Sequence, residues 1–535
     1  MSSMKVVETI AERLAAAGVK RIYGLPGGEM LDILEATRQA GIQFVLVHHE
    51  AAAAFMAAAE GHHRRSLAAC ISTIGPGATN LVSGIAHAYL DRCPVIALTA
   101  DLPTTLGQDY THQRLDLPRL FAPITKGSYI LEAKSAASVT EAAIALATTE
   151  PFGPVSLHIP RDVALQQAEI PATPTYVSIP ACHGDLSVEA VAAKLNQAEH
   201  PLVIVGLGTP PAAAEAIRHF VEVYGAPAGV TPKVKGILDE RHPLFTGTYG
   251  GMMAESVLID FIRERDLILC IGVDPTELDR DWPGKERFVW LLPSLNVGQS
   301  KLPANAWCGA LEPGLQQLSQ LVEGGKFDSR AEAASLRRAV RAKLEKGIPA
   351  QPRGMSPLRA IETLAEVWPA SERVCCDVGA HKLLMGQAWP ATVPNRFFMS
   401  NGLSAMGFGI AAPIALSLAA EGAPVLSVIG DGGLLMYLGE LETAVREGAH
   451  VLYVVFCDAS LALIESSQRR RGYTKYGMQF NAPEVVHLGT FFGLPAWQAS
   501  SKAEITEAIR AFTALNGPAL LGVTIDPREY DHQIS

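Results

Sequence analysis

Val425-Leu-Ser-Val-Ile-Gly-Asp-Gly-Gly433 joins a short apolar run to an acidic, glycine-rich turn. A run that is apolar throughout is typical of a strand buried on both faces of a parallel sheet. In open α/β sheets, ligands bind outside the carboxyl ends of such strands. Glycines there let the backbone approach a phosphate, and the helix predicted next, Tyr437 to Glu447, presents its N-terminus to it. This stretch therefore predicts an α/β fold with a ligand site at the turn.

Asp431, in the middle of the turn, predicts a metal ion beside the phosphate. A carboxylate repels a phosphate, so Asp431 fits better as a ligand of a hard cation that bridges to it. Such an ion needs further oxygen ligands. The next apolar run, Val451–Phe456, is followed by Asp458 and then Ser460. We predict a divalent-metal site formed by the Asp431 and Asp458 carboxylates and the Ser460 carbonyl.

Similar apolar runs recur along the whole chain, and longer helical patterns separate them. At about 150 residues per domain, the 535 residues suggest three or four domains. Two proline-rich stretches, 170–180 and 347–357, have the character of linkers. We predict an α/β protein of three doubly wound parallel-sheet domains, at 1–170, 185–345 and 356–530. The other predicted strands are Phe44–Val47, Ala68–Ser72, Val95–Thr99, Val155–Ile159, Leu202–Val205, Leu267–Ile271, Val374–Asp377 and Ala519–Thr524.

Composition and charge exclude several classes of protein. With 44 Lys and Arg against 54 Asp and Glu, the net charge is −10, and non-specific nucleic-acid binding needs a basic surface instead. The 8 cysteines show no CxxC pair, which favours reduced thiols in a cytoplasmic protein. Residues 1–20 are typical of an amphipathic helix rather than a signal peptide. The uncharged stretch Asn401–Ala420 is rich in glycine and small residues, which favours a buried helix over a membrane span.

The Gly430-Asp-Gly turn, followed after the next strand by Asp458, resembles the signature of thiamine-diphosphate enzymes. The resemblance covers nearly the whole chain and is closest to catabolic acetolactate synthases, which also carry Asp where most of the family has Asn. It implies a pyrimidine-binding (PYR) first domain, a central domain and a diphosphate-binding (PP) third domain. The cofactor-binding residues that it implies are Gly27, Gly75, Asn80, Met406, Gly430, Asp431, Gly432, Gly433, Asp458, Ser460 and Leu461.

Glu50 is the catalytic residue that the resemblance implies most directly. It stands in Val47-His-His-Glu50, where the family has the glutamate that contacts the pyrimidine ring. A carboxyl group bonded to the pyrimidine N1′ promotes the imino tautomer, whose nitrogen removes the thiazolium proton. Met406 stands where the family has a bulky apolar residue that bends the cofactor.

Thr111-His-Gln-Arg114, with Pro123-Ile-Thr-Lys126 further on, is similar to the catabolic acetolactate synthases. Gln113 is then the catalytic amide that faces the reacting carbon, where it can bond a carbonyl oxygen. His112 is either a proton donor or an ordinary loop histidine. The resemblance weakens after the metal site: Arg469–Arg471 either contacts a substrate carboxylate or forms a solvated basic face, and Glu465 has no evident partner.

The resemblance implies an enzyme that uses thiamine diphosphate and Mg²⁺. It would decarboxylate a pyruvate-like 2-keto acid and add the remaining fragment to a second carbonyl, as acetolactate synthases do. A simple decarboxylase, with His48 and His49 as proton donors, and a carbon–carbon lyase stay open as alternatives. A homodimer or homotetramer is expected, with no nucleic-acid or membrane partner.

The middle third carries Gly206-Leu-Gly208, which raises the question of a nucleotide. It lacks the third glycine and the later acidic residue of a dinucleotide-binding fingerprint, which argues against an NAD-dependent dehydrogenase. Flavin-holding relatives have an Ala-Arg-Phe-Asp-Asp-Arg run where this chain has Ile271-Gly-Val-Asp-Pro275. We expect no FAD.

Overall fold

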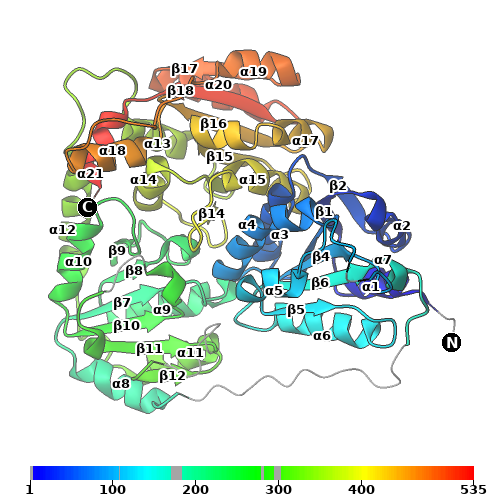
Figure 1. Cartoon of the computed structure of the whole chain (residues 1–535). Helices are drawn as coiled ribbons and strands as arrows, with labels where there is room; N and C mark the ends of the chain where they lie inside the picture. Colours follow the sequence, from blue (N-terminus) through cyan, green and yellow to red (C-terminus); the bar gives the residue numbers. More distant parts are fainter. Residues whose placement is uncertain (1–3, 108, 170–183, 279–281, 295–302, 535) are drawn as a thin grey trace. The chain divides into compact units, whose positions relative to one another are not determined.

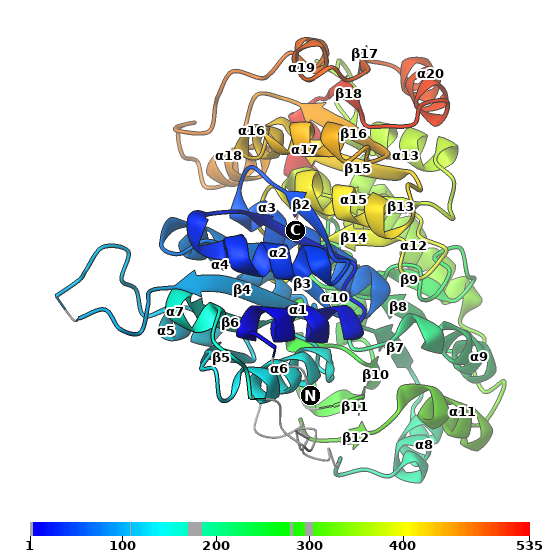
Figure 2. The same ribbon diagram turned by 90° about the vertical axis from the view of Figure 1, so that its right-hand side faces the viewer.

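The computed structural model describes residues 4–107, 109–169, 184–278, 282–294 and 303–534; the predicted linker 170–180 lies outside them. The described chain forms three six-stranded sheets, and neighbouring strands in each sheet pair in parallel (Figure 1; Figure 2). Helices separate most of the strands along the chain. The predicted class, three doubly wound parallel sheets, is confirmed.

The first sheet has the order β2-β1-β3-β4-β6-β5. Its strands are β1 (Arg21–Leu25), β2 (Gln43–Leu46), β3 (Ala68–Ser72), β4 (Val95–Asp101), β5 (Gly127–Ile130) and β6 (Val155–Pro160). Helices α1 (Val6–Ala16), α2 (Leu31–Gln39) and α6 (Ala136–Thr148) share a core with one face of the sheet. Helix α3 (Glu50–Arg64) packs against β1 and β3, and it also contacts α4 (Pro76–Leu90) and α15 (Phe408–Ala419).

The second sheet has the order β12-β11-β10-β7-β8-β9. Its strands are β7 (Pro201–Val205), β8 (Ala228–Val230), β9 (Phe245–Thr248), β10 (Leu267–Ile271), β11 (Phe288–Leu292) and β12 (Ala306–Cys308). Alternate residues of β7 enter different cores: Val203 packs with α8 (Val188–Gln197) and α9 (Ala214–Tyr224), and Ile204 with α10 (Glu255–Arg263) and α12 (Arg330–Glu345). Burial of both faces explains the continuous apolar run.

The third sheet has the order β14-β13-β15-β16-β18-β17. Its strands are β13 (Arg373–Cys376), β14 (Phe397–Met399), β15 (Val425–Gly430), β16 (Val451–Cys457), β17 (Ala496–Ala499) and β18 (Ala519–Thr524). It shares a core with α13 (Pro357–Val367), α14 (Ala380–Ala388) and α20 (Lys502–Thr513). When the strands of each sheet are numbered from its own first strand, the third sheet has the same strand order as the first. The sequence patterns do not predict this repetition.

Each predicted apolar run forms a strand, and the helix predicted over Tyr437–Glu447 is present but shorter and is not the first helix after the turn. A short helix, α16 (Asp431–Met436), begins at Asp431 itself, and α17 (Glu440–Arg446) follows after a break. The reason is local, because Asp431 Oδ1 accepts the Gly432 amide at 2.8 Å and so satisfies a donor at the start of α16. The two glycines, poor helix formers, hide this start in the sequence.

Three further expectations can be compared with the structure. The apolar face of α1 is buried, and α15 is a buried helix within the uncharged stretch 401–420, as predicted. Among the described residues, none of the helices has the length and apolar character needed to cross a membrane.

The expectation of reduced cysteines is wrong for Cys308, which is disulfide-bonded. It lies partly exposed at the end of β12, and linear spacing does not reveal such a pair.

Candidate functional site

Glu50 begins α3 and is held from two sides. The residue before it, His49, caps the helix by accepting the Ala51 amide on Nδ1 at 3.1 Å. Glu50 is only 4% exposed. Asn80 Nδ2 donates to its Oε2 at 2.9 Å, and a Cβ at Gly77 would lie 3.2 Å from its Oε1. Helix α4 therefore fixes this carboxyl group with an amide and leaves space for its second oxygen.

Gln113 lies against the glycine turn that leads into α4. Gly75 has φ +65°, and a Cβ there would lie 3.0 Å from Gln113 Cγ. Gln113 itself has φ 55°, and Arg114 braces its loop by donating to the carbonyls of Tyr110 at 2.6 Å and Gly107 at 3.0 Å. The same turn thus joins Gln113 to the helix that holds Glu50. His112 is exposed, and its ring lies edge-on to Tyr110 with centroids 6.4 Å apart.

Gly27 lies at another turn of the first sheet. It follows β1, and a Cβ on it would collide with the Thr73 side chain after β3. Strands β1 and β3 are neighbours where the strand order reverses, which is where open α/β sheets bind ligands. Gly27 and the Gly75 turn therefore lie at the expected edge of this sheet.

Glu440 of α17 fixes the backbone in front of Glu50. Its Oε1 accepts the amides of His48 at 2.9 Å and His49 at 3.0 Å, and the Thr443 hydroxyl donates to its Oε2 at 2.7 Å. Burial raises the pKa of Glu440 above its ordinary value. His48 Nε2 lies 2.8 Å from Glu442 Oε2. Both histidines thus have structural partners here.

Asp431 organises the edge of the third sheet. Its Oδ2 accepts the amides of Asp458 at 3.0 Å and Ala459 at 2.8 Å, and its Oδ1 accepts that of Gly432. Asp458 Oδ1 in turn accepts the Ser460 amide at 3.1 Å. Burial, and then repulsion from Asp431, raises the pKa of Asp458 to about 7. A buried and a half-buried carboxylate that repel each other are a donor set that a divalent cation stabilises.

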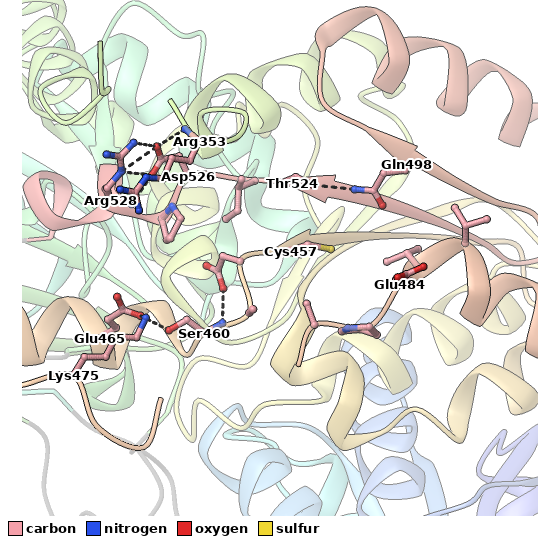
Figure 3. A pocket seen from close by; sticks show the side chains of 18 of the residues that line it. Arg353, Cys457, Ser460, Glu465, Lys475, Glu484, Gln498, Thr524, Asp526 and Arg528 are labelled. Atoms are coloured by element: carbon pink, nitrogen blue, oxygen red, sulfur yellow. Dashed lines mark hydrogen bonds and ion pairs between the residues drawn. The ribbon is translucent and has the colours of Figure 1, made fainter. Parts of the chain in front are cut away.

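Glu465, on α18 (Ala462–Arg470), has the partners that the sequence did not reveal (Figure 3). The Ser460 hydroxyl donates to its Oε2, and Lys475 Nζ lies 2.5 Å from the same oxygen. Arg469 pairs with Glu465 Oε1 at 2.5 Å and forms two bonds to Asp531, at 2.8 and 2.7 Å. Arg469 is therefore engaged by acidic partners, while Arg470 and Arg471 are exposed.

A cleft of about 790 Å³ opens beside Asp458 and Ser460, at the carboxyl ends of β16, β17 and β18. Figure 3 shows Ser460, Glu465 and Lys475 on one side of it, and Gln498 bonded to Thr524 on another. Polar groups from several strand ends converge on this space. A small polar substrate or part of a cofactor can enter it.

Three family models for thiamine pyrophosphate enzymes match the chain in succession. They are the N-terminal TPP binding domain at residues 4–120, the central domain at 188–296 and the C-terminal TPP binding domain at 377–523. A probable acetolactate synthase large subunit from Methanocaldococcus jannaschii is 31% identical, over 98% of this chain and 93% of its own. The chain belongs to the thiamine pyrophosphate enzymes. Acetolactate synthase isozyme 1 large subunit of Escherichia coli (29%; 98% and 94% covered) and chloroplastic acetolactate synthase of Arabidopsis thaliana (29%; 98% and 82%) are also similar.

This thiamine pyrophosphate enzyme has one more candidate that sequence reasoning missed, His381. It lies on α14, after β13, and β13 neighbours β15 where the order of the third sheet reverses. A Cβ on Gly430 would lie 3.2 Å from His381 Cε1. Its Nε2 is buried without a hydrogen-bond partner among the described residues. Burial lowers its pKa to about 4, so the ring is neutral at pH 7. An unpartnered polar atom beside Gly430 fits a phosphate ligand.

The predicted site residues of this thiamine pyrophosphate enzyme thus gather in two clusters. Glu50, Asn80, Gly75 and Gln113 belong to the first, which is joined by α4 and its turn. The second cluster contains Gly430, Asp431, Gly432, Asp458 and Ser460 at the ends of β15 and β16. Gly433 lies in α16. Leu461 caps α18 and donates its amide to the Met478 carbonyl at 3.0 Å, while Met406 is partly buried before α15.

Proposed function

We propose that this protein is a thiamine-diphosphate- and Mg²⁺-dependent carboligase of the acetolactate synthase type. It decarboxylates a pyruvate-like 2-keto acid and adds the remaining fragment to a second carbonyl. The observation that carries the proposal is the pair of clusters: a buried Glu50 held by Asn80, and the Asp431–Asp458–Ser460 edge. The names of the similar acetolactate synthases support the choice of reaction.

We assign each part of the cofactor to donor groups of the chain. Asp431, Asp458 and the Ser460 carbonyl would hold Mg²⁺, since hard cations take oxygen ligands. The start of α16 and His381 would hold the diphosphate, and Glu50 the pyrimidine ring. When bound, thiamine diphosphate supplies an electron-accepting ring that lets carbon dioxide leave a 2-keto acid.

Glu50 and Gln113 have distinct roles in this proposal. The Glu50 carboxyl group would hold or release the proton shared with the pyrimidine N1′, and its low exposure would keep water from competing for that proton. Asn80 keeps the carboxyl group pointed in one direction. The Gln113 amide is neutral, so it can donate to a substrate carbonyl oxygen without supplying a proton that would end the reaction early.

Carboligation is favoured over simple decarboxylation by the positions of His48 and His49. A decarboxylase needs a proton donor for the reacting carbon. His49 Nδ1 caps α3 by accepting the Ala51 amide, and His48 Nε2 bonds to Glu442 Oε2. These two ring nitrogens are therefore already engaged in structural hydrogen bonds. This supports capture of the fragment by a second carbonyl.

Incubation of the pure protein with thiamine diphosphate, Mg²⁺ and pyruvate tests the proposal directly. Acetolactate as product would support it, and acetaldehyde would support the decarboxylase instead. Absence of pyruvate turnover together with tight cofactor binding would reject the substrate but keep the cofactor. Absence of cofactor binding would reject the whole proposal.

The remaining assignments are also proposals. They comprise PYR, central and PP domains at 1–170, 185–345 and 356–530, a homodimer or homotetramer, and a cytoplasmic location. The dimer is proposed because the two clusters would have to face one cofactor, and the resemblance places them on different copies. Sedimentation of the protein at several concentrations measures the assembly.

Gln113→Ala is expected to lower kcat/KM by about 10- to 100-fold, with cofactor affinity unchanged. Gln113 is exposed, so the loss should be smaller than the roughly 100- to 1,000-fold of a preorganised donor to a reacting oxygen. His112→Ala, one position away on the same exposed loop, is the matched control. A change of less than about threefold there would identify His112 as an ordinary loop residue, since surface substitutions usually have small effects. Equal losses in both variants would contradict the role of Gln113 and indicate a general loop effect.

Glu465→Ala is expected to weaken Mg²⁺ binding by about 10-fold, as loss of a residue behind a metal ligand commonly does. The reason is that Glu465 holds the Ser460 hydroxyl, and Ser460 supplies both a carbonyl for the metal and an amide for Asp458. Glu465→Gln keeps an acceptor for Ser460 and should bind Mg²⁺ nearly as well as wild type. Calorimetric titration with Mg²⁺ measures both, with exposed Glu507→Ala as a control. Unchanged affinity in Glu465→Ala would contradict the prediction.

A further inference from the structure

The rule that places ligand sites in open parallel sheets can be applied to each of the three sheets. In an open parallel sheet, the crevice lies between the two neighbouring strands where the order reverses. In the first sheet these strands are β1 and β3, and in the third β13 and β15. Both positions carry the candidate site residues described above. In the second sheet the corresponding pair is β7 and β10, and no predicted site residue lies there.

The turns after β7 and β10 contact each other directly. Gly206-Leu207-Gly208 follows β7, and the Gly208 amide donates to the Gly272 carbonyl after β10 at 2.7 Å. A Cβ on Gly206 would collide with the Val273 backbone and would lie 2.7 Å from Glu277 Oε2. The glycines that elsewhere admit a phosphate here admit the neighbouring turn. The crevice is narrow at the point where a ligand would enter.

The Glu277 carboxyl group occupies what is left of this space. Its Oε2 accepts the amide of Leu207 at 2.8 Å and that of Asp274 at 3.2 Å, and its Oε1 bonds the Thr231 hydroxyl. Glu277 is 1% exposed. Backbone amides from both turns are therefore already satisfied by an oxygen of the chain itself. These are the donors that a bound phosphate normally uses.

We propose that Glu277 is a built-in occupant of the anion position in the central domain, so that this domain binds neither a flavin nor any other nucleotide. The carboxyl group does the work of a structural ligand: it links the turn after β7, the turn after β10 and Thr231. The inference rests on the central sheet alone and does not depend on the proposed reaction.

The charge of Glu277 agrees with this structural role. Burial, with a further contribution from nearby Asp274, raises its pKa to about 8. The group is thus mainly uncharged at neutral pH, and its oxygens accept the two amides and the Thr231 hydroxyl. Its folded pKa exceeds the ordinary value of 4.5, so its contribution to stability is complete below about pH 4.5 and is lost as the pH rises through 8. Glu277→Gln should remove that part of the pH dependence of urea unfolding.

Binding experiments on the full-length protein test the proposal. Wild-type protein, saturated with thiamine diphosphate and Mg²⁺ to fill the other phosphate site, is titrated with FAD, ADP and inorganic phosphate. We expect a colourless protein and no heat of binding at millimolar concentrations. Stoichiometric binding of FAD or ADP, or flavin that copurifies with the protein, would overturn the proposal.

A pair of variants tests the position itself. Glu277→Ala frees the two amides, so inorganic phosphate should raise its melting temperature, whereas Glu277→Gln keeps the space filled and should not respond. A folded Glu277→Ala protein that is indifferent to phosphate would reject an anion position here. If Glu277→Ala does not fold, the wild-type titrations and the Glu277→Gln unfolding curves decide the question.

Discussion

Glu50→Gln should lower the turnover of the 2-keto acid by at least about 100-fold, because general acid–base groups commonly contribute 10²- to 10⁴-fold. A glutamine cannot exchange a proton with the pyrimidine nitrogen. It does keep an oxygen that can accept the Asn80 amide, so the surroundings of α3 and α4 should stay intact. The expected loss is therefore in kcat, with the melting temperature nearly unchanged.

Two measurements separate chemistry from folding in this variant. Steady-state rates at saturating thiamine diphosphate give kcat, and proton–deuterium exchange at the thiazolium carbon, followed by NMR, reports the first step alone. Both should fall together. Glu35→Gln, an exposed glutamate on α2, is the matched control and should behave as wild type. Full activity in Glu50→Gln would remove the mechanism proposed for this protein.

Asp431→Asn should abolish binding of Mg²⁺ and thiamine diphosphate at concentrations that saturate wild type. Both oxygens of Asp431 accept backbone amides, from Gly432 on one side and from Asp458 and Ala459 on the other. An asparagine must place its NH₂ group against one of these donors. Each buried donor left without an acceptor costs about 1–3 kcal/mol, in addition to the lost metal ligand.

Asp458→Asn is the informative comparison with Asp431→Asn, because Asp458 accepts fewer hydrogen bonds from the backbone than Asp431 does. Only Oδ1 of Asp458 accepts an amide, that of Ser460, and an asparagine oxygen can take that place. The change also removes the repulsion from Asp431. Calorimetry should show Mg²⁺ affinity within about 10-fold of wild type, a loss of no more than about 1.4 kcal/mol. Equal losses in the two variants would contradict the central role given to Asp431.

Local sequence patterns predicted the parts of the site that follow directly from a buried strand. Val425–Gly430 and Val451–Cys457 are short apolar runs, so the positions of Asp431 and Asp458 after them could be read without a structure. Glu50 also follows a predicted strand, but its role is implied by the family resemblance rather than by the local pattern. These predictions hold because the carboxyl ends of neighbouring parallel strands meet at one edge of a sheet.

Contacts between distant segments could not be predicted in this way. His381 has no distinctive spacing, and only the order of β13 and β15 brings it to Gly430. Glu465 has its partners because the chain after α18 returns to pair Gln479 with Ser460, which carries Lys475 to the same place. The bond between Glu277 and Leu207 likewise spans two turns far apart in the sequence.

The common strand order of the first and third sheets has a consequence for the history of the chain. Two sheets wound in one order are what duplication and fusion of a single ancestral gene would leave behind. On that view the carboxyl ends of the two sheets, one with Glu50 and the other with Asp431, descend from one ancestral edge and have since diverged. The central sheet, with its different winding, would then be a later insertion between the two copies.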